Sequence, residues 1–207
     1  MVMIDPSAIS ARDNYKLLIG SIIPRPIAFV TTLSADGVLN AAPFSFFNIV
    51  SSNPPMVSVS VQRRDGVRKD TARNAIGNGQ FVVHIADESY VEQLNVTAGS
   101  FAPTESEVAA AGLTPVASER IAVPGIAEAR IRLECELEHA LELGGDAAAG
   151  GDPACDLLIG RVVYYHIDDA LYDEHGHIDP NALQPVSRLA GHDYAKLGEL
   201  FTLERPL

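Results

Sequence analysis

The chain has few cysteines and few basic residues for its length. Its 207 residues include only Cys135 and Cys155, which do not form a CxxC motif. We therefore expect reduced thiols in a cytosolic setting, with a disulfide between the two as the alternative. Lys and Arg number 15 against 27 Asp and Glu, which gives a net charge of −12. This balance argues against a nucleic-acid partner, because such affinity depends on neutralising phosphates.

Long apolar runs and the common nucleotide-binding motifs are also missing. No stretch approaches the roughly 20 apolar residues that a membrane span needs. The N-terminal MVMIDPSAISARDNY lacks the apolar segment of a signal peptide. We therefore expect a soluble, cytoplasmic protein with no membrane partner. Neither GxGxxG nor GxxxxGK[ST] occurs, which removes the usual dinucleotide-fold and P-loop interpretations.

The remaining sequence predicts one domain, residues 1–207, built mainly from strands. With 47% hydrophobic residues, the chain is long enough to bury its own core. Alternation and β-branched runs predict extended segments at 27–33, 38–42, 44–50, 56–62, 81–85, 129–143 and 156–167. Asp36-Gly37 predicts a hairpin between the first two. The glycine-rich segment 144–152 predicts a long, mobile hairpin loop.

Helices are expected at three places between these strands. The first covers 70–76, with Asp70 or Thr71 as its N-cap and Gly77 and Gly79 at its end. An amphipathic helix is expected at 87–96, and a capping box at 104–107 predicts a short helix through residue 111. Because strands outnumber helices and lack helical crossovers, we expect a mostly β fold. The predicted architecture is an antiparallel barrel with a few peripheral helices.

Two segments have the composition of a ligand site. The segment 40–48 (NAAPFSFFN) combines small residues, which let a flat ring approach the backbone, with the polar groups of Ser45 and Asn48. An ordinary strand pair packed under a helix is the alternative. Lys69-Asp70-Thr71 begins a predicted helix, whose free N–H groups favour a phosphate. The alternative there is a capped surface helix, and Arg63, Arg64 and Arg68 either assist the site or are solvated.

Other polar groups are assigned structural roles. His175-Gly176-His177 lies among acidic residues in a predicted loop, and we interpret it as a solvated turn and not a metal site. His84 and His139 fall within strands and are expected to be satisfied core histidines. No serine lies in a segment that resembles a nucleophile elbow, so a hydrolase is not expected.

Residues 24–62 resemble the flavin reductase-like, FMN-binding split-barrel family. The family pattern N-A-x-x-x-S-[WF]-F-x-x-V-S-x-[DN]-P-P-[LM] is met at every fixed position from Asn40 to Met56. The preceding PRPIAFVTT is similar to the first barrel strand of the family, and most similar to its flavoredoxin-like branch. Lys69-Asp70-Thr71 and the C-terminal R-L-x-G-x-x-Y, beginning at Arg188, resemble two further family motifs.

The resemblance implies a dimeric split barrel that binds FMN non-covalently near the subunit interface. It places Thr31 and Thr32 by the ribityl-phosphate and Lys69, Asp70 and Thr71 at the phosphate itself. It places the segment of Asn40, Ala41, Ala42, Pro43, Ser45, Phe47 and Asn48 by the ring. It also implies four site residues in the C-terminal tail, namely Arg188, Gly191, His192 and Tyr194. The alternative for the tail is a terminal helix with Tyr194, Leu197 and Phe201 as its apolar stripe.

The reaction implied by the resemblance is hydride transfer from NAD(P)H to flavin N5. In such enzymes the flavin supplies the chemistry, so no acid or base residue is predicted. The implied partners are a second copy of the chain and an oxygenase or redox protein. Two alternatives remain, because one fold can host several roles. The first is an electron carrier with tightly bound FMN reduced by a protein donor, and the second is a flavin-binding protein without turnover.

Overall fold

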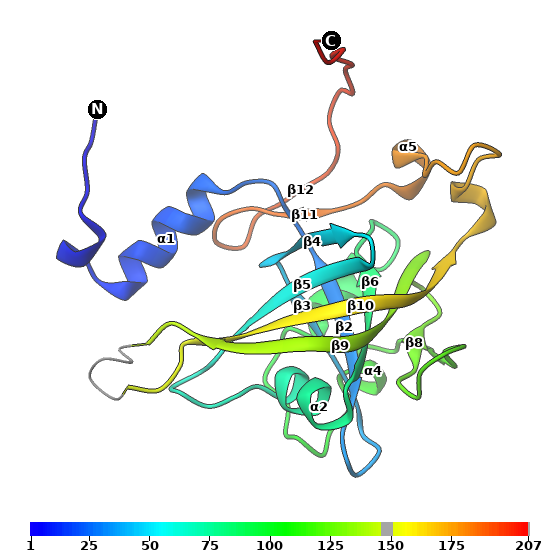
Figure 1. Ribbon diagram of the computed structural model, residues 1–207, viewed down its shortest axis with the longest axis horizontal. Helices are drawn as coiled ribbons and strands as arrows, with labels where there is room; N and C mark the ends of the chain where they lie inside the picture. The colour runs from blue at the N-terminus through cyan, green and yellow to red at the C-terminus, as the bar shows by residue number, and fades with distance from the viewer. Residues whose placement is uncertain (146–150, 207) are drawn as a thin grey trace.

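The structure is a computed structural model that describes residues 1–145 and 151–206, and its centre is one antiparallel sheet (Figure 1). Seven strands lie side by side in the order β3, β2, β6, β9, β10, β5, β4. Their bounds are β2 (Ala28–Leu33), β3 (Leu39–Phe44), β4 (Phe47–Ser52), β5 (Pro55–Gln62), β6 (Gln80–Ile85), β9 (Ile131–Leu143) and β10 (Cys155–Ile167). The predicted mostly β, antiparallel architecture is confirmed.

The short connection between the two edge strands requires this sheet to curl into a barrel. Strands β3 and β4 are the two edges of the sheet, yet only Ser45 and Phe46 separate them in the sequence. The N–H of Ser60 on β5 donates to the carbonyl of Phe46 at 2.8 Å. The bend therefore brings the end of β3 directly against β5, and the sheet closes on itself. The predicted extended segment 44–50 is thus broken at residues 45 and 46.

Strand alternation produces an apolar cluster on each face of β2. Val30 points into the barrel, where it joins a cluster with Phe81. Phe29 points to the opposite face and packs in a second cluster with Tyr90 and Leu94. Because successive side chains of a strand point to opposite faces, one buried apolar strand can serve both cores. The second cluster fixes the segment that follows α3 against the barrel.

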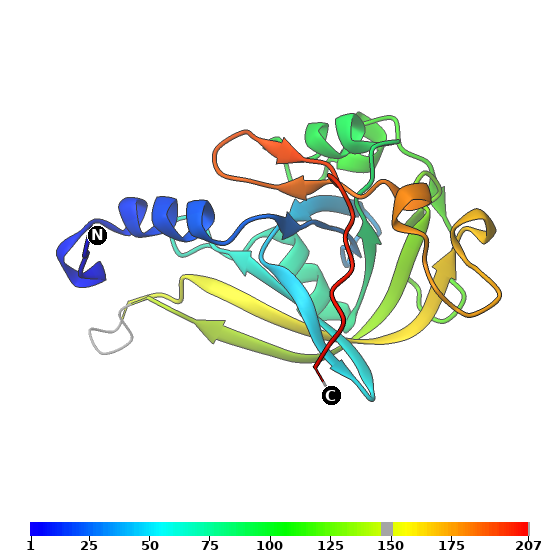
Figure 2. The ribbon, with the colours of Figure 1, turned by 90° about the horizontal axis from the view of Figure 1, so that it is seen from above.

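Short helices and small sheets surround the barrel. The helical elements are η1 (Pro6–Ala8), α1 (Ala11–Ser21), α2 (Asp70–Asn78), α3 (Val91–Val96), α4 (Glu107–Ala110), η3 (Asp169–Leu171) and α5 (Pro180–Leu183). The small strands are β1 (Arg25–Pro26), β7 (Pro115–Val116), β8 (Gly125–Ile126), β11 (Ser187–Arg188) and β12 (Tyr194–Ala195). Figure 2 shows α1 projecting away from the barrel. No helix among the described residues has both the length and the apolar character needed to cross a membrane.

Several local predictions are confirmed. Strands β2 and β3 form the predicted hairpin, with Leu33 opposite Leu39. Helix α2 ends at Asn78, and its C-cap is Gly79, whose φ of +73° is the left-handed conformation that favours glycine, whereas Gly77 lies within the helix. Strands β9 and β10 are paired as a hairpin with Cys155 opposite Leu143. Residues 146–150, the centre of the predicted glycine-rich loop, lie outside the described residues.

The helix starts were predicted less well. Lys69, and not Asp70 or Thr71, is the N-cap of α2, and no side chain caps this end. The helix expected at 87–96 begins only at Val91, because the carboxylate of Asp87 accepts the N–H of Ser89 in a turn. The capping box at 104–107 is wrong, because α4 begins at residue 107 and its cap residue bonds to another element.

Predictions for individual side chains had mixed outcomes. His84 is a satisfied core histidine, whereas His139 is exposed on the long β9–β10 hairpin. The terminal helix considered for the tail is wrong, because Tyr194 lies in β12 and residues 196–206 have no regular secondary structure. Both cysteines are free thiols, and burial strongly raises the pKa of Cys135.

Candidate functional site

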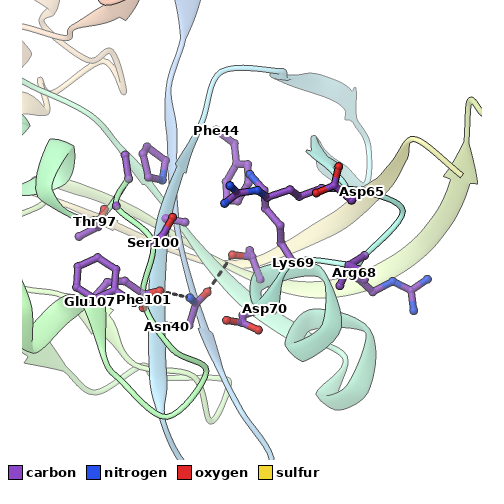
Figure 3. Close-up of a pocket in the computed structure, with 17 residues that line it drawn as sticks. Asn40, Phe44, Asp65, Arg68, Lys69, Asp70, Thr97, Ser100, Phe101 and Glu107 are labelled. Atoms are coloured by element: carbon purple, nitrogen blue, oxygen red, sulfur yellow. Dashed lines mark hydrogen bonds between the residues drawn. The ribbon is translucent and has the colours of Figure 1, made fainter.

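Two adjoining pockets form one continuous depression beside β3, which we call the trough. The first, about 690 Å³, lies between β3, the start of α2 and residues 97–101 (Figure 3). The second, about 490 Å³, extends from the end of β3 to the β11–β12 hairpin. Pro43, Phe44, Ala98 and Gly99 line both pockets. The trough therefore runs from a helix N-terminus at one end to the C-terminal hairpin at the other.

The α2 end of the trough carries two cations, Lys69 and Arg64, with Asp65 and Asp70 in the same lining. The N-terminus of α2 has no side-chain cap, so its first N–H groups remain available. Lys69 and Arg64 line the same pocket. Burial lowers the pKa of Lys69, and the nearby charge of Arg64 acts in the same direction. Neither cation has a carboxylate within ion-pairing distance among residues 1–145 and 151–206. This end of the trough fits a phosphate group.

The two neighbouring arginines are held by carboxylates. Both donate to Asp156, Arg63 at 2.7 Å and Arg68 at 3.0 Å, and both also pair with Glu142. Burial alone would raise the pKa of Asp156, but hydrogen bonds from the two guanidinium groups bring it below its usual range. Figure 3 shows Arg68 directed away from the centre of the pocket. Of the three arginines considered from sequence, only Arg64 remains for a ligand.

A buried polar network forms the wall between α2 and β3. The side-chain amide of Asn40 donates to a carboxylate oxygen of Glu107 at 2.8 Å, and the hydroxyl of Thr71 donates to the amide oxygen of Asn40 at 2.9 Å (Figure 3). Thr32 also donates to that amide oxygen, at 3.2 Å. Asn40 and Thr71 line the trough, yet their polar groups are bonded to each other.

The far end of the trough is formed by the C-terminal hairpin. Arg188, His192 and Tyr194 line the second pocket. The guanidinium carbon of Arg188 lies 4.5 Å from the ring centre of Tyr194, and the guanidinium donates to the carbonyl of Gly191. Arg25 holds the hairpin to β1 by donating to the carbonyl of Leu189 at 2.8 Å. The hairpin thus presents a cation that is fixed before any ligand binds.

The structure brings most, but not all, of the predicted site residues into the trough. Those that line it are Asn40, Ala42, Pro43, Ser45, Lys69, Asp70, Thr71, Arg188, His192 and Tyr194. Thr31, Thr32 and Ala41 are fully buried and do not line it. Thr31 lies opposite Ala41 in the β2–β3 register, and its hydroxyl donates to the carbonyl of Pro124 at 2.7 Å.

Three other predicted residues also lie away from the trough. Phe47 and Asn48 follow the bend after β3, and they line two apolar grooves and not the trough, although one groove shares Ser45 with it. Gly191 forms the tight turn of the C-terminal hairpin with φ of +60°, and only its carbonyl contacts a site residue. In this structure, direct contact between these side chains and a ligand in the trough is therefore not available.

Sequence reasoning missed two parts of the trough. The first is the loop Thr97-Ala98-Gly99-Ser100, which directly follows the helix predicted at 87–96. Its small residues were a signal: a Cβ on Gly99 would lie 3.0 Å from the ring of Phe101, so a larger residue would crowd this wall. The second is Glu107, whose contacts join residues far apart in the sequence.

Comparisons with known proteins show the family of this chain. Residues 19–182 match the family model described as flavin reductase like domain. The protein YwrF of Bacillus subtilis is 56% identical over all 207 residues and over its own full length.

Two solved structures provide further comparisons. Nitrilotriacetate monooxygenase component B from Bacillus cereus is 60% identical, with a TM-score of 0.95 over 98% of both chains. The 2-nitrobenzoate 2-nitroreductase NbaA of Pseudomonas fluorescens is 32% identical, with a TM-score of 0.87 over 99% of this chain and 96% of its own. The chain therefore belongs to the flavin reductase-like family of split-barrel flavoproteins.

Proposed function

We propose that this protein is an NAD(P)H:flavin reductase that binds FMN non-covalently in the trough. The observation that carries the proposal is that Lys69 and Arg64, which form no ion pair among the described residues, lie beside an uncapped helix N-terminus at one end of the trough. When bound, the flavin would supply the redox chemistry by accepting a hydride at N5 from the nicotinamide. The protein's contribution is binding and orientation.

We assign phosphate binding to one end of the trough and contact with the nicotinamide substrate to the other. The first N–H groups of α2, with Lys69 and Arg64, would hold the phosphate. The small side chains of Ala42 and Pro43 leave room for a flat ring along β3, beside Phe44. Ser45 and the hairpin residues at the far end would then contact the reduced nicotinamide substrate. Arg188 is suited to an anionic group of that substrate, because its guanidinium is already positioned.

The acceptor of the reduced flavin is proposed to be a separate protein. The name of the Bacillus cereus relative marks it as one component of a monooxygenase. By analogy, we propose an oxygenase partner for this chain. The net charge of −12 also favours a second candidate, an electron carrier that docks on a basic redox protein. In that case FMN would remain bound and a protein donor would reduce it.

The proposal includes a homodimer. A groove of about 540 Å³ beside the β4–β5 hairpin is lined almost entirely by apolar side chains, among them Phe47, Val57 and Val162. Strand β4 is an edge of the sheet, and Ile49 on it is 75% exposed. Apolar surface gathered along an unpaired strand edge favours protein association. A second copy of this chain is the partner that the family resemblance implies.

Kinetics under two donors separate the candidates. A reductase should oxidise NADH or NADPH in steady state with excess FMN, at a rate that saturates with both substrates. An electron carrier should be reduced slowly by either nicotinamide but rapidly by a reduced redox protein. If neither donor reduces protein-bound FMN, both candidates are contradicted and a flavin-binding protein without turnover remains.

A further inference from the structure

Glu107 is a buried carboxylate that joins α4 to β3 in the wall of the trough. Its side chain is 7% exposed, and it lies at the first position of α4. One carboxylate oxygen accepts from the side-chain amide of Asn40 at 2.8 Å, and the other accepts from the backbone N–H of Ala41 at 3.1 Å. The preceding Ser106 donates to the carbonyl of Leu39 at 2.6 Å. The N-cap of α4 and its first residue therefore fasten this helix to three consecutive residues of β3.

The carboxylate also fixes the orientation of the Asn40 side chain. With its NH₂ group donated to Glu107, Asn40 directs its oxygen toward α2. That oxygen accepts the hydroxyl of Thr71 at 2.9 Å and the hydroxyl of Thr32 at 3.2 Å. Asn74 of α2 in turn donates to the hydroxyl oxygen of Thr32 at 3.3 Å. Every donor in this network points toward an acceptor, and the series ends at the carboxylate.

We propose that Glu107 is a positioning residue that sets the distance between the α2 end of the trough and the β3 wall. The proposal rests on the proposed FMN site. The Thr71 hydroxyl already donates its hydrogen bond to Asn40, so it is not free to donate one to a phosphate. The backbone N–H groups of α2 and the two cations remain as the phosphate donors, and the Asn40–Thr71 bond holds α2 where they can act.

Glu107→Gln tests this role with almost no change in size. A glutamine offers one acceptor and one NH₂ group where two donors, from Asn40 and Ala41, need acceptors. Because buried donors must be satisfied, Asn40 would rotate and lose the bond from Thr71. Glu92→Gln on α3 is the matched control, because it removes the same charge from an exposed side chain.

The measurement is the ratio of the dissociation constants for riboflavin and FMN, obtained from flavin fluorescence. Riboflavin lacks the phosphate, so general loosening of the fold would weaken both ligands together. We expect Glu107→Gln to raise the FMN dissociation constant about tenfold, the effect of one charge-assisted hydrogen bond, and the riboflavin constant by less than twofold. Glu92→Gln should leave both constants unchanged.

A second pair of variants keeps the test decisive if Glu107→Gln does not fold. Thr71→Val removes the hydroxyl and retains the shape, whereas Thr71→Ser retains the hydroxyl. The valine variant should lower the riboflavin-to-FMN ratio and the serine variant should not. An unchanged ratio in both Glu107→Gln and Thr71→Val would overturn the positioning role while leaving the FMN site intact. If the wild-type protein binds neither flavin, the proposed function itself is overturned.

Discussion

Lys69 is the residue whose charge most directly concerns the proposed phosphate site. It is partly buried beside Arg64, and both side chains line the same pocket. We predict that Lys69→Gln raises the dissociation constant of FMN about tenfold, because one charge-assisted hydrogen bond is lost. The binding of riboflavin should change little. Fluorescence titration of both ligands measures this, with the exposed Lys16→Gln as a charge-matched control. Equal weakening of FMN and riboflavin would contradict the assignment.

His84 makes stability depend on pH from inside the core. Burial lowers its pKa to about 3, although its hydrogen bond to the Phe29 carbonyl opposes this shift. In the unfolded chain the histidine pKa is about 6.5. As pH falls below that value, the unfolded state binds the proton first, and the free energy of unfolding decreases by up to about 1.4 kcal/mol per pH unit. This decrease continues until pH approaches the folded value.

Urea unfolding at pH 7 and pH 5 tests this prediction. His84→Gln should be less stable than the wild type at pH 7, because the ring accepts the N–H of Ile126 at 2.9 Å and also bonds to Phe29. However, the variant should lose less stability between the two pH values. The same loss in both proteins would mean that His84 does not titrate during unfolding.

At the scale of elements, the C-terminal hairpin is proposed to contact the nicotinamide substrate. We predict that Arg188→Gln raises the KM for NADH about tenfold and leaves FMN binding unchanged, because the guanidinium lies at the opposite end of the trough from Lys69. Steady-state kinetics at saturating FMN measure the effect, and Arg12→Gln on α1 controls for the charge. A change in FMN affinity with constant KM would place Arg188 at the flavin instead.

Elements governed by local patterns were predictable from the sequence. The strand alternation, the Asp36-Gly37 turn and the glycine at the end of α2 each act within a few residues. Some helix starts were not, because polar residues there bond to a distant strand, as at the start of α4. Thr104 and Glu107 have the spacing of a capping box. However, Ser106 is the N-cap of α4, and Ser106 and Glu107 both bond to residues of β3 that lie 67 positions away in the sequence.

In the candidate site, too, local sequence patterns were predictable but contacts between distant residues were not. The motif at 40–48 predicted a ligand-binding stretch, but only tertiary structure shows which of its side chains reach the trough. Ala42 and Ser45 line it, whereas Phe47 follows the bend that closes the barrel and faces another groove. Similarly, Arg64 could not be separated from its neighbours by sequence, because Asp156, which holds Arg63 and Arg68, lies on β10.

For the whole molecule, we predict a dimer that uses the apolar groove beside β4. Replacement of the exposed Ile49 by Lys should convert the protein to a monomer, because a charge would have to be buried in the interface. Light scattering during size-exclusion chromatography measures the mass, with exposed Leu141→Lys on the β9–β10 hairpin as the control. A wild-type mass equal to one chain would contradict the dimer.

Every function proposed for this protein requires that it binds a flavin. The absorbance spectrum of FMN, recorded alone and with the purified protein, tests it most directly. We predict that the near-ultraviolet and blue bands shift with one FMN per chain and bleach when NADH or NADPH is added without oxygen. Bands that shift but do not bleach would retain the site and favour the electron carrier. A spectrum unchanged by the protein at any concentration would contradict flavin binding by this protein.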